Sequence, residues 1–252
     1  MPRFYVDPSE IGTERIVLSG GNYNHVKNVL RKQVGDTLLI CDGQGSEFDC
    51  EIISEEAGTI VLRIADRRQS TSELPVSVVL FQGIPKKDKM EWIIEKSVEL
   101  GASAVVPVSC MRSVVKFNDD KREEKKTVRW NAIAEAAAKQ SGRGIVPEVA
   151  SPMSFREAML FAKETCDGIL FPYENAEGMH ELKIAADGIT NGQKIAVFIG
   201  PEGGFDPEEV AFAESCGAKI ISLGSRILRT ETAGLAVLSY LMLRIEMAEG
   251  NA

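Results

Sequence analysis

A glycine-rich loop near the carboxyl end of the chain could hold a ligand against its backbone. The apolar run 195–199 leads into residues 200–205 (GPEGGF), and Asp206 then offers a helix N-cap followed by a proline. Glycines in such a turn let a ligand approach the backbone closely, although a purely structural turn could have the same composition. The loop lacks the Gly-Lys-Ser/Thr of a P-loop and the spacing of a dinucleotide-binding loop. ATP and NAD are therefore not the expected ligands.

A second loop places charged side chains at the beginning of a helix. The run 220–223 ends at Gly224, and residues 225–233 (SRILRTETA) lead into a long apolar helix. Arg229 and Glu231 stand at its amino end, where the positive pole of the helix gives an arginine no stabilisation. An anionic partner or a substrate would explain the arginine, and a weak surface ion pair with Glu231 is the alternative.

The histidines and cysteines favour chemistry without a metal. The five cysteines are scattered without a CxxC pair, and the two histidines, His25 and His180, have no ligand pattern around them. An H-E-x-x-H hydrolase is excluded, and a Ser-His triad would have to use one of these two residues.

The elements that must position both loops predict an α/β fold. From residue 76 onward, continuous apolar runs alternate with helix-length segments, which is typical of a mainly parallel sheet. Such folds bind ligands at the carboxyl ends of their strands, where both loops fall. The predicted strands are 76–83, 104–108, 168–172, 194–200 and 219–223, and the predicted helices are 87–100, 119–141, 180–187, 207–216 and 230–247.

The amino-terminal part has a different pattern. Short β segments with turn signals between them predict a small barrel, with one helix near residues 21–31. The polar stretch 67–75 (RRQSTSELP) is a plausible linker. We therefore expect two domains, 1–72 and 73–252. The predicted strands of the first are 3–6, 37–41, 47–54 and 59–64.

Composition and charge narrow the class of protein. The 252 residues are 44% hydrophobic, with no apolar run of membrane-spanning length and no signal-peptide pattern at the start, so we expect a soluble cytoplasmic protein. The net charge of −8 argues against indiscriminate nucleic-acid binding. Residues 112–143 nevertheless carry nine Lys/Arg against five Asp/Glu, and residues 86–89 (KKDK) add a second basic cluster. One face could meet a polyanion, or these charges could form a solvated helix face.

The two loops together resemble the carboxyl-terminal signature of the ribosomal small-subunit RNA (uracil-N3) methyltransferases. This family belongs to the knotted SPOUT class and uses S-adenosylmethionine. Matching stretches are spread over nearly the whole chain: MPRFYV at the start, His25 with residues 29–31 (VLR), residues 89–92 (KMEW) with 95–96 and 99–101, Pro107 with residues 112–113, residues 129–130 (RW), and residues 135–137 with 140–143 (QSGR).

The resemblance implies a fold, a cofactor and partners. It implies a PUA-like RNA-binding barrel over 1–72 and a SPOUT α/β-knot methyltransferase domain, with a trefoil knot, over 73–252. The family acts on 16S rRNA of the small ribosomal subunit as a homodimer, with no membrane and no metal. The apolar last helix could supply the dimer interface or be buried in the core. Residues carried over as binding S-adenosylmethionine are Leu170, Phe171, Ile199, Gly200, Pro201, Glu202, Gly203, Leu223, Gly224, Ile227, Leu228, Thr232 and Ala233.

The implied reaction sets the chemical roles. Methylation of uracil at N3 requires that the N3 proton leave, and negative charge then develops on the flanking carbonyl oxygens. We expect Arg229 to stabilise that charge. Glu202 or Glu231 could take the proton, but each also has a structural role open to it, and the acceptor need not be a side chain.

RNA contacts are expected from cations in both domains, with a solvated charge as the alternative for each. Trp92 and Trp130 lie within predicted helices and are expected in the core. The candidate RNA-binding residues are Arg3, His25 and Arg31 in the barrel and Lys86, Lys89, Arg112, Arg129 and Arg143 in the α/β domain.

Two other functions remain open from the sequence. An enzyme of the same class could act on another RNA, such as a tRNA ribose 2′-hydroxyl, because the GPEGG loop does not distinguish the two substrates. A ribosome-assembly factor that binds RNA without catalysis is the third possibility, although the intact glycines and Arg229 argue against it.

The basic clusters on an acidic chain predict RNA binding that depends strongly on salt. Each neutralised phosphate releases counterions, so affinity should fall steeply between low and moderate salt. Filter binding to 16S rRNA over a salt series measures this, and an affinity that barely changes would contradict the basic-face hypothesis.

Overall fold

The computed structural model describes residues 3–56, 58–113, 120–176 and 178–249, and the chain divides into two compact units. The first unit combines Met1–Glu73 with Ala138–Val146, and the second combines Leu74–Ala137 with Pro147–Ala252. The first unit thus includes a segment from far along the chain. The domain boundary expected after residue 72 would assign the segment Ala138–Val146 to the second domain instead.

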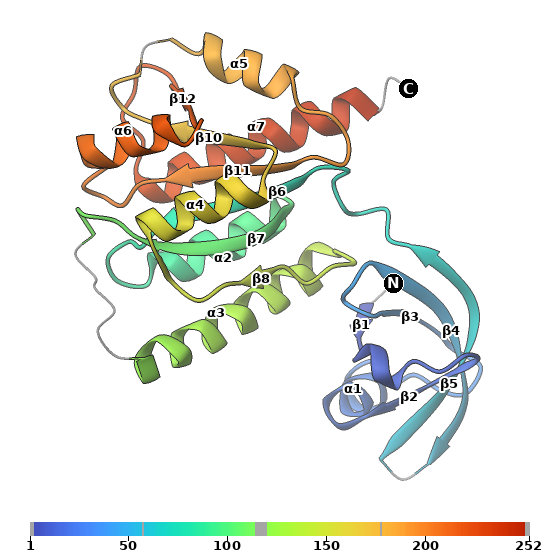
Figure 1. The fold of residues 1–252 in the computed structure, drawn as a ribbon. Helices are drawn as coiled ribbons and strands as arrows, with labels where there is room; N and C mark the ends of the chain where they lie inside the picture. Colours follow the sequence, from blue (N-terminus) through green and yellow to red (C-terminus); the bar gives the residue numbers. More distant parts are fainter. Residues whose placement is uncertain (1–2, 57, 114–119, 177, 250–252) are drawn as a thin grey trace. The chain divides into compact units, whose positions relative to one another are not determined.

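Five strands form the sheet of the first unit, in the order β1-β3-β4-β5-β2 (Figure 1). β1 runs parallel to β3, and the other neighbours are antiparallel. The predicted strands are confirmed, but β5 continues into the expected linker because Arg68 pairs with Glu47 of β4 across the ladder. The elements are β1 (Arg3–Tyr5), a 3-10 turn (Pro8–Glu10), β2 (Arg15–Ser19), β3 (Thr37–Cys41), β4 (Ser46–Glu56) and β5 (Thr59–Gln69).

A short helix follows β2, at one edge of this sheet, and contacts β1 at the other edge. Helix α1 (Gly20–Asn24) continues into one wider, π-helical turn (His25–Val29) and stops short of the predicted end, because Arg31 adopts a left-handed backbone with φ of 53°. The Asn22 amide donates to the carbonyl of Tyr5 in β1 at 2.9 Å. The core of the unit is apolar: Phe4, Val6, Ile16, Leu18, Val26, Leu38, Ile40, Phe48, Cys50, Ile52, Ile60 and Leu62 are buried together.

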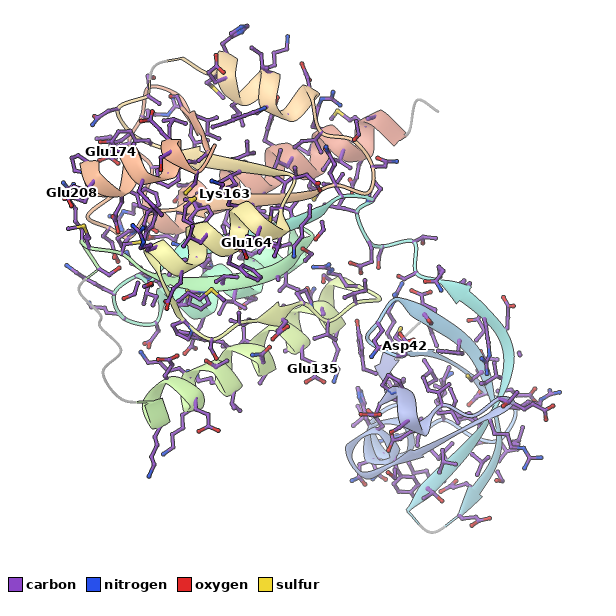
Figure 2. The ribbon with its side chains drawn as sticks, viewed as in Figure 1. Asp42, Glu135, Lys163, Glu164, Glu174 and Glu208 are labelled. Atoms are coloured by element: carbon purple, nitrogen blue, oxygen red, sulfur yellow. The ribbon has the colours of Figure 1, made fainter. Side chains whose placement is uncertain are left out.

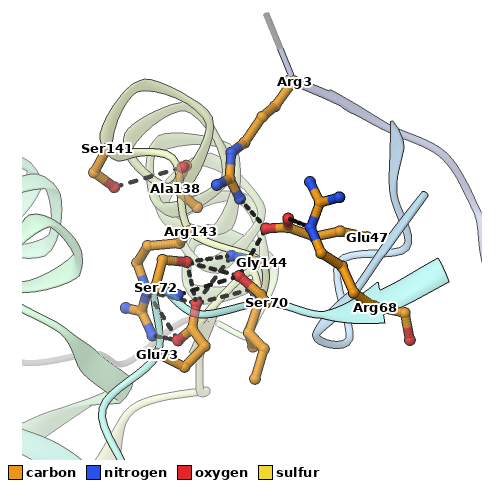
Figure 3. Close-up of polar contacts among 12 residues, drawn as sticks. Arg3, Glu47, Arg68, Ser70, Ser72, Glu73, Ala138, Ser141, Arg143 and Gly144 are labelled. Carbon is orange, nitrogen blue, oxygen red and sulfur yellow. Dashed lines mark hydrogen bonds and ion pairs between the residues drawn. The ribbon is translucent and has the colours of Figure 1, made fainter. Parts of the chain in front are cut away.

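A buried ion pair anchors the segment around Arg143 in the first unit (Figure 3). The Arg143 guanidinium lies 2.5 Å from the Glu73 carboxylate, and the two side chains are only 5% and 17% exposed. The backbone amide of Gly144 donates to the same carboxylate at 2.9 Å. Arg3 pairs in a similar way with the buried Glu47. These contacts stabilise the unit across a long separation in sequence.

The second unit contains the predicted parallel sheet. Its strand order is β12-β10-β11-β6-β7-β8, with β9 also paired to β7, and every pairing is parallel. The strands are β6 (Ser77–Gly83), β7 (Ala102–Ser109), β8 (Glu148–Val149), β9 (Met153–Ser154), β10 (Gly168–Pro172), β11 (Lys194–Ile199) and β12 (Lys219–Ile221).

Helices cover both faces of this sheet (Figure 1). The helices α2 and α7 pack together over β6, β7 and β11, while α4 and α6 contribute to the core on the other face. Sequence analysis missed α4, although its capping box, Ser154 with Glu157, is a readable signal. The helices are α2 (Lys89–Glu99), α3 (Asp120–Ser141), α4 (Phe155–Thr165), α5 (His180–Asp187), α6 (Pro207–Ser215) and α7 (Thr230–Glu249).

Phenylalanines connect the sheet core to one of the candidate loops. The rings of Phe81 and Phe198 stack with centroids 4.4 Å apart in neighbouring strands. Phe205, the last residue of the GPEGGF loop, is buried with its ring centroid 4.2 Å from that of Phe171 in β10. The loop after β11 is therefore fixed to the core by its own phenylalanine.

The two tryptophans differ in burial. Trp130 is 4% exposed, which confirms the core prediction, but the same prediction for Trp92 is wrong because 45% of that residue is exposed. In α2 the buried residues include Met90, Ile93 and Ile94. At 100° per residue, Trp92 falls on the opposite side of the helix from this stripe.

The last helix is mainly a core helix. Its residues Val237, Leu238, Leu241 and Ile245 are buried within the chain, whereas Leu243 and Met247 are exposed. No helix in the described part of the chain combines the length and the apolar character needed to cross a membrane.

We predict that Arg143→Ala will lower the free energy of unfolding by about 3–5 kcal/mol, because it leaves the largely buried Glu73 carboxylate without its cation. The matched control is Arg129→Ala, since Arg129 pairs with Glu91 at 2.8 Å but is 68% exposed. That variant should cost at most about 1 kcal/mol. Urea unfolding followed by circular dichroism measures both, and equal losses would contradict the structural role of Arg143.

Candidate functional site

A cavity of about 900 Å³ opens in the second unit where three neighbouring parallel strands end. Its wall is formed by residues from the end of β10 and the segment that follows (172–176 and 178–179), from the end of β11 and its loop (199–205) and from the loop after β12 (222–230), with Lys89 and Ala233 from two helices. Parallel strands bring their carboxyl ends to one edge, so loops far apart in sequence meet there. Both loops chosen from the sequence line this cavity.

Most residues carried over as cofactor-binding line the cavity. Leu170 and Phe171 do not, because they are strand residues buried in the sheet, and Thr232 is exposed outside the lining. Their assignment stays a prediction. The lining residues among those expected are Ile199, Gly200, Pro201, Glu202, Gly203, Leu223, Gly224, Ile227, Leu228 and Ala233.

Sequence reasoning missed the segment that follows β10. Tyr173, Glu174 and Met179 line the cavity, but no glycine motif marks their part of the sequence. The sequence marks these residues by their position alone, because they follow directly after a predicted strand. The labelled Glu174 lies at this end of the unit (Figure 2), and its carboxylate comes within 2.9 Å of the point where a Cβ on Gly204 would lie.

Local geometry explains the composition of the GPEGGF loop. Gly204 has φ of 67°, a left-handed conformation that favours glycine, and a side chain there would also have to displace the nearby Glu174 carboxylate. The predicted N-cap is confirmed: Asp206 and Glu209 form a capping box at the start of α6. The loop is thus a tight strand-to-helix turn that exposes backbone to the cavity.

One buried hydroxyl joins the two loops. Thr230, the first residue of α7, donates its hydroxyl proton to the carbonyl of Gly200 at 2.6 Å. The same oxygen accepts a hydrogen bond from the side-chain amide of Gln82 at 2.8 Å, at the end of β6. These contacts hold the start of α7 against the ends of β6 and β11.

A cluster of four charges lies at the edge of the cavity. The Lys89 ammonium is 3.1 Å from Glu202 and 3.2 Å from Glu231. Arg229 is 4.0 Å from Glu231, but its side chain is 82% exposed. The two proposed catalytic glutamates therefore both contact Lys89, and Arg229 reaches one of them over a long distance that leaves its guanidinium accessible.

The environment of Glu202 favours its ionised form. Partial burial acts to raise the pKa of this carboxyl, but hydrogen bonds from the backbone amides of Glu202 and Lys86 and from Lys89 outweigh it and lower the pKa. The Lys86 amide lies 3.1 Å and 3.2 Å from the two carboxylate oxygens. Any stabilisation from this arrangement is present at neutral pH and is lost as the pH falls through the lowered pKa.

The same carboxylates act on Lys89. Hydrogen bonds to Glu202 first and Glu231 second raise the pKa of this lysine. Lys89 is therefore a cation with two carboxylate partners rather than a free phosphate contact.

The remaining candidate RNA-binding residues fall into two groups. Arg3 and Arg143 have carboxylate partners within the first unit, so their guanidinium groups stabilise the fold. Arg112 contacts Asp206 at 3.3 Å and remains accessible. Exposed side chains are found at His25, Arg31, Lys86, Arg112 and Arg129.

The described residues contain no group of three or more His, Cys, Asp or Glu side chains placed to hold a metal ion.

Comparison with known proteins gives consistent matches over the whole chain. Residues 72–242 match the model of an RNA methyltransferase domain, and residues 18–65 match that of an RNA methyltransferase PUA domain. The ribosomal RNA small subunit methyltransferase E of Bacillus subtilis is 34% identical over 257 aligned positions, covering 100% of both chains.

Solved structures agree with these matches. A putative methyltransferase from Legionella pneumophila, in complex with the cofactor SAM, is 32% identical with a TM-score of 0.79, covering 96% of this chain and 97% of that one. A ribosomal RNA small subunit methyltransferase E from Neisseria gonorrhoeae, bound to S-adenosyl methionine, is 30% identical with a TM-score of 0.80 and the same coverage.

We predict that Thr230→Val will lower the free energy of unfolding by about 1–3 kcal/mol, because it removes both hydrogen bonds of the buried hydroxyl without changing its volume much. Thr232→Val is the matched control on the same helix, where the side chain is exposed, and it should change stability by at most about 0.5 kcal/mol. Urea unfolding of both variants tests this. Equal stability of the two would contradict the role given to Thr230.

Proposed function

The chain belongs to the ribosomal RNA small subunit methyltransferase E family, and from this premise we propose that it transfers a methyl group from S-adenosylmethionine to N3 of a uridine in 16S rRNA. It has the SPOUT α/β-knot fold with a PUA-like unit. The observation that carries the proposal is the cavity formed by three strand-end loops, with a lysine, an arginine and two glutamates at its edge.

The residues of the cavity fit the cofactor. Its volume of about 900 Å³ is ample for a nucleoside with an amino-acid tail, and its wall combines apolar side chains with the backbone of glycine-rich loops. We infer that Gly200, Gly203 and Gly224 let backbone groups reach the ligand, while Leu223 and Leu228 supply apolar contact. When bound, S-adenosylmethionine would supply an activated methyl group.

Of the two glutamates, Glu231 is the better proton acceptor. Backbone amides and Lys89 already engage Glu202, and its lowered pKa makes it a weak base. Among the described residues, the Glu231 carboxylate has the Lys89 contact at 3.2 Å and the long Arg229 contact, and its side chain is 17% exposed. We therefore assign the N3 proton to Glu231 and give Glu202 the role of holding the loop after β11 against Lys86 and Lys89.

Arg229 fits the role of stabilising the negative charge on the uracil oxygens. Its side chain lines the cavity and is 82% exposed, so a substrate can reach it. The nearby carboxylates would repel an anionic uracil ring, and Lys89 and Arg229 balance them in formal charge. A guanidinium that contacts the uracil oxygens most strongly when negative charge develops on them stabilises the transition state. It therefore accelerates the chemical step rather than tightening the binding of the substrate.

The family resemblance also supports a homodimer acting on ribosomal RNA in the cytoplasm. The exposed residues Leu243 and Met247 on α7 could contribute to such an interface, since the rest of that apolar stripe is buried in the chain itself. Light scattering across a dilution series would give the oligomeric state.

The proposed function is tested with methyl-labelled S-adenosylmethionine and either unmodified 30S subunits or naked 16S rRNA. Mass spectrometry of the nucleosides should find the label in N3-methyluridine, and the two RNAs compared show whether assembly must come first. Label in another nucleoside would overturn the substrate while keeping the enzyme class. Absence of both label and cofactor binding would overturn the enzyme assignment.

We predict that Glu231→Gln will lower kcat by about 10²–10⁴-fold while the Kd for S-adenosylmethionine stays nearly unchanged, because the variant loses the proton acceptor. Glu202→Gln is the matched variant, and it should mainly weaken cofactor binding because it loosens the loop after β11. Single-turnover kinetics and calorimetric titration separate the two effects. The reverse pattern would assign the proton to Glu202.

A further inference from the structure

The end of β6 carries a glutamine where a strand of the core calls for an apolar side chain. Gln82 is 0% exposed, and the residues before it, Leu80 and Phe81, belong to the apolar core. Its amide nitrogen donates to two oxygens, the carbonyl of Gly83 at 2.9 Å and the hydroxyl of Thr230 at 2.8 Å. Both protons of the amide group are therefore used.

The carbonyl oxygen of the same side chain is buried without a partner. Among the described residues, two buried side-chain oxygens have no hydrogen bond, Oε1 of Gln82 and Oγ of Ser97. Rotating the amide by half a turn would not pair Oε1, because it would then face the carbonyl of Gly83, which is also an acceptor. A buried acceptor without a donor destabilises a fold. An apolar side chain of similar shape would therefore serve the core at least as well as Gln82 does.

The Gln82 amide determines the direction of the Thr230 hydroxyl. Because the amide donates to the hydroxyl oxygen, the hydroxyl proton is directed to the carbonyl of Gly200, 2.6 Å away. Thr230 is buried and is the first residue of α7. Its chain neighbours are Arg229 and Glu231, so the contact with Gln82 fixes the backbone between these two proposed catalytic residues.

The next residue of β6 approaches the GPEGGF loop closely. A Cβ on Gly83 would lie 2.6 Å from the backbone nitrogen of Pro201 and 2.8 Å from the carbonyl carbon of Gly200. The strand therefore packs directly against the peptide bond between these two loop residues. Neither Gln82 nor Gly83 is among the residues that line the cavity. The end of β6 thus supports the site from behind.

We propose that Gln82 is a positioning residue for methyl transfer. Through the Thr230 hydroxyl it holds the first turn of α7, and with it the Glu231 carboxylate and the Arg229 guanidinium. This inference rests on the proposed function and adds a residue that touches neither cofactor nor substrate. Because a small misplacement of catalytic groups slows the chemical step, the contact acts on kcat. The stability of the fold does not depend on it, since the amide also buries an unpaired oxygen.

Kinetics of Gln82→Met test the positioning role. Methionine keeps the length and approximate volume of the side chain but donates no hydrogen bond. We expect kcat to fall by about 5- to 100-fold, within the loss that a 1 Å misplacement can cause. The KM for 16S rRNA and the Kd for S-adenosylmethionine should stay nearly unchanged, because Thr230 still donates to Gly200. The midpoint of urea unfolding should not fall. A lower midpoint with kcat retained would assign Gln82 to the fold alone and overturn the proposal.

Two further variants separate positioning from a general effect of core substitutions. Ser97→Ala is the matched control, because Ser97 carries the other unpartnered oxygen and does not line the cavity. It should leave kcat unchanged. In a Thr230→Val background, Gln82→Met should lower kcat no further, because the hydroxyl that transmits its effect is absent. An equal loss of kcat in both backgrounds, or the same loss in Ser97→Ala, would contradict the proposal.

Hydrogen–deuterium exchange of the protein without cofactor gives a readout that does not depend on methyl transfer. Gln82→Met should raise exchange in peptides that cover the start of α7 (230–234), whereas Ser97→Ala should not. Unchanged exchange in this segment would overturn the link between Gln82 and α7. Faster exchange there, in a protein whose parent form transfers no methyl group, would support the link and count against the proposed function alone.

Discussion

The hydrogen bonds of one threonine hydroxyl connect the parts of the site. Thr230 joins the first turn of α7 to the carbonyl of Gly200, and Gln82 at the end of β6 completes the link. Two loops that are remote in sequence thereby share one geometry. The third segment of the cavity, after β10, is positioned by the packing of Phe171 against Phe205. Thus a parallel sheet supplies the edge, and a few buried contacts determine the shape of the cavity.

The charges at the edge of the cavity follow from the same arrangement. Lys89 begins α2, Glu202 lies in the loop after β11, and Glu231 lies in the first turn of α7, so their ion pairs connect three elements. Because backbone amides hold Glu202, we propose that this residue orders the loop and that Glu231 takes part in the chemistry.

Local signals in the sequence predicted the parallel sheet and two of the three cavity loops. Glycine and helix-cap residues mark the ends of β11 and β12, and apolar runs mark the strands themselves. The segment after β10 carries no such mark, and the carried-over residues Leu170 and Phe171 proved to be buried strand residues. Distant pairs such as Arg143 with Glu73 leave no local pattern, so an arginine expected to meet RNA turned out to be part of the fold.

The central claim is that the three strand-end loops hold S-adenosylmethionine together. Hydrogen–deuterium exchange with and without the cofactor tests it most directly, because each loop reports separately. The account predicts that protection from exchange rises in segments 172–176, 199–205 and 222–230 at the same cofactor concentration. Protection confined to other segments, or in only one of these three, would contradict it.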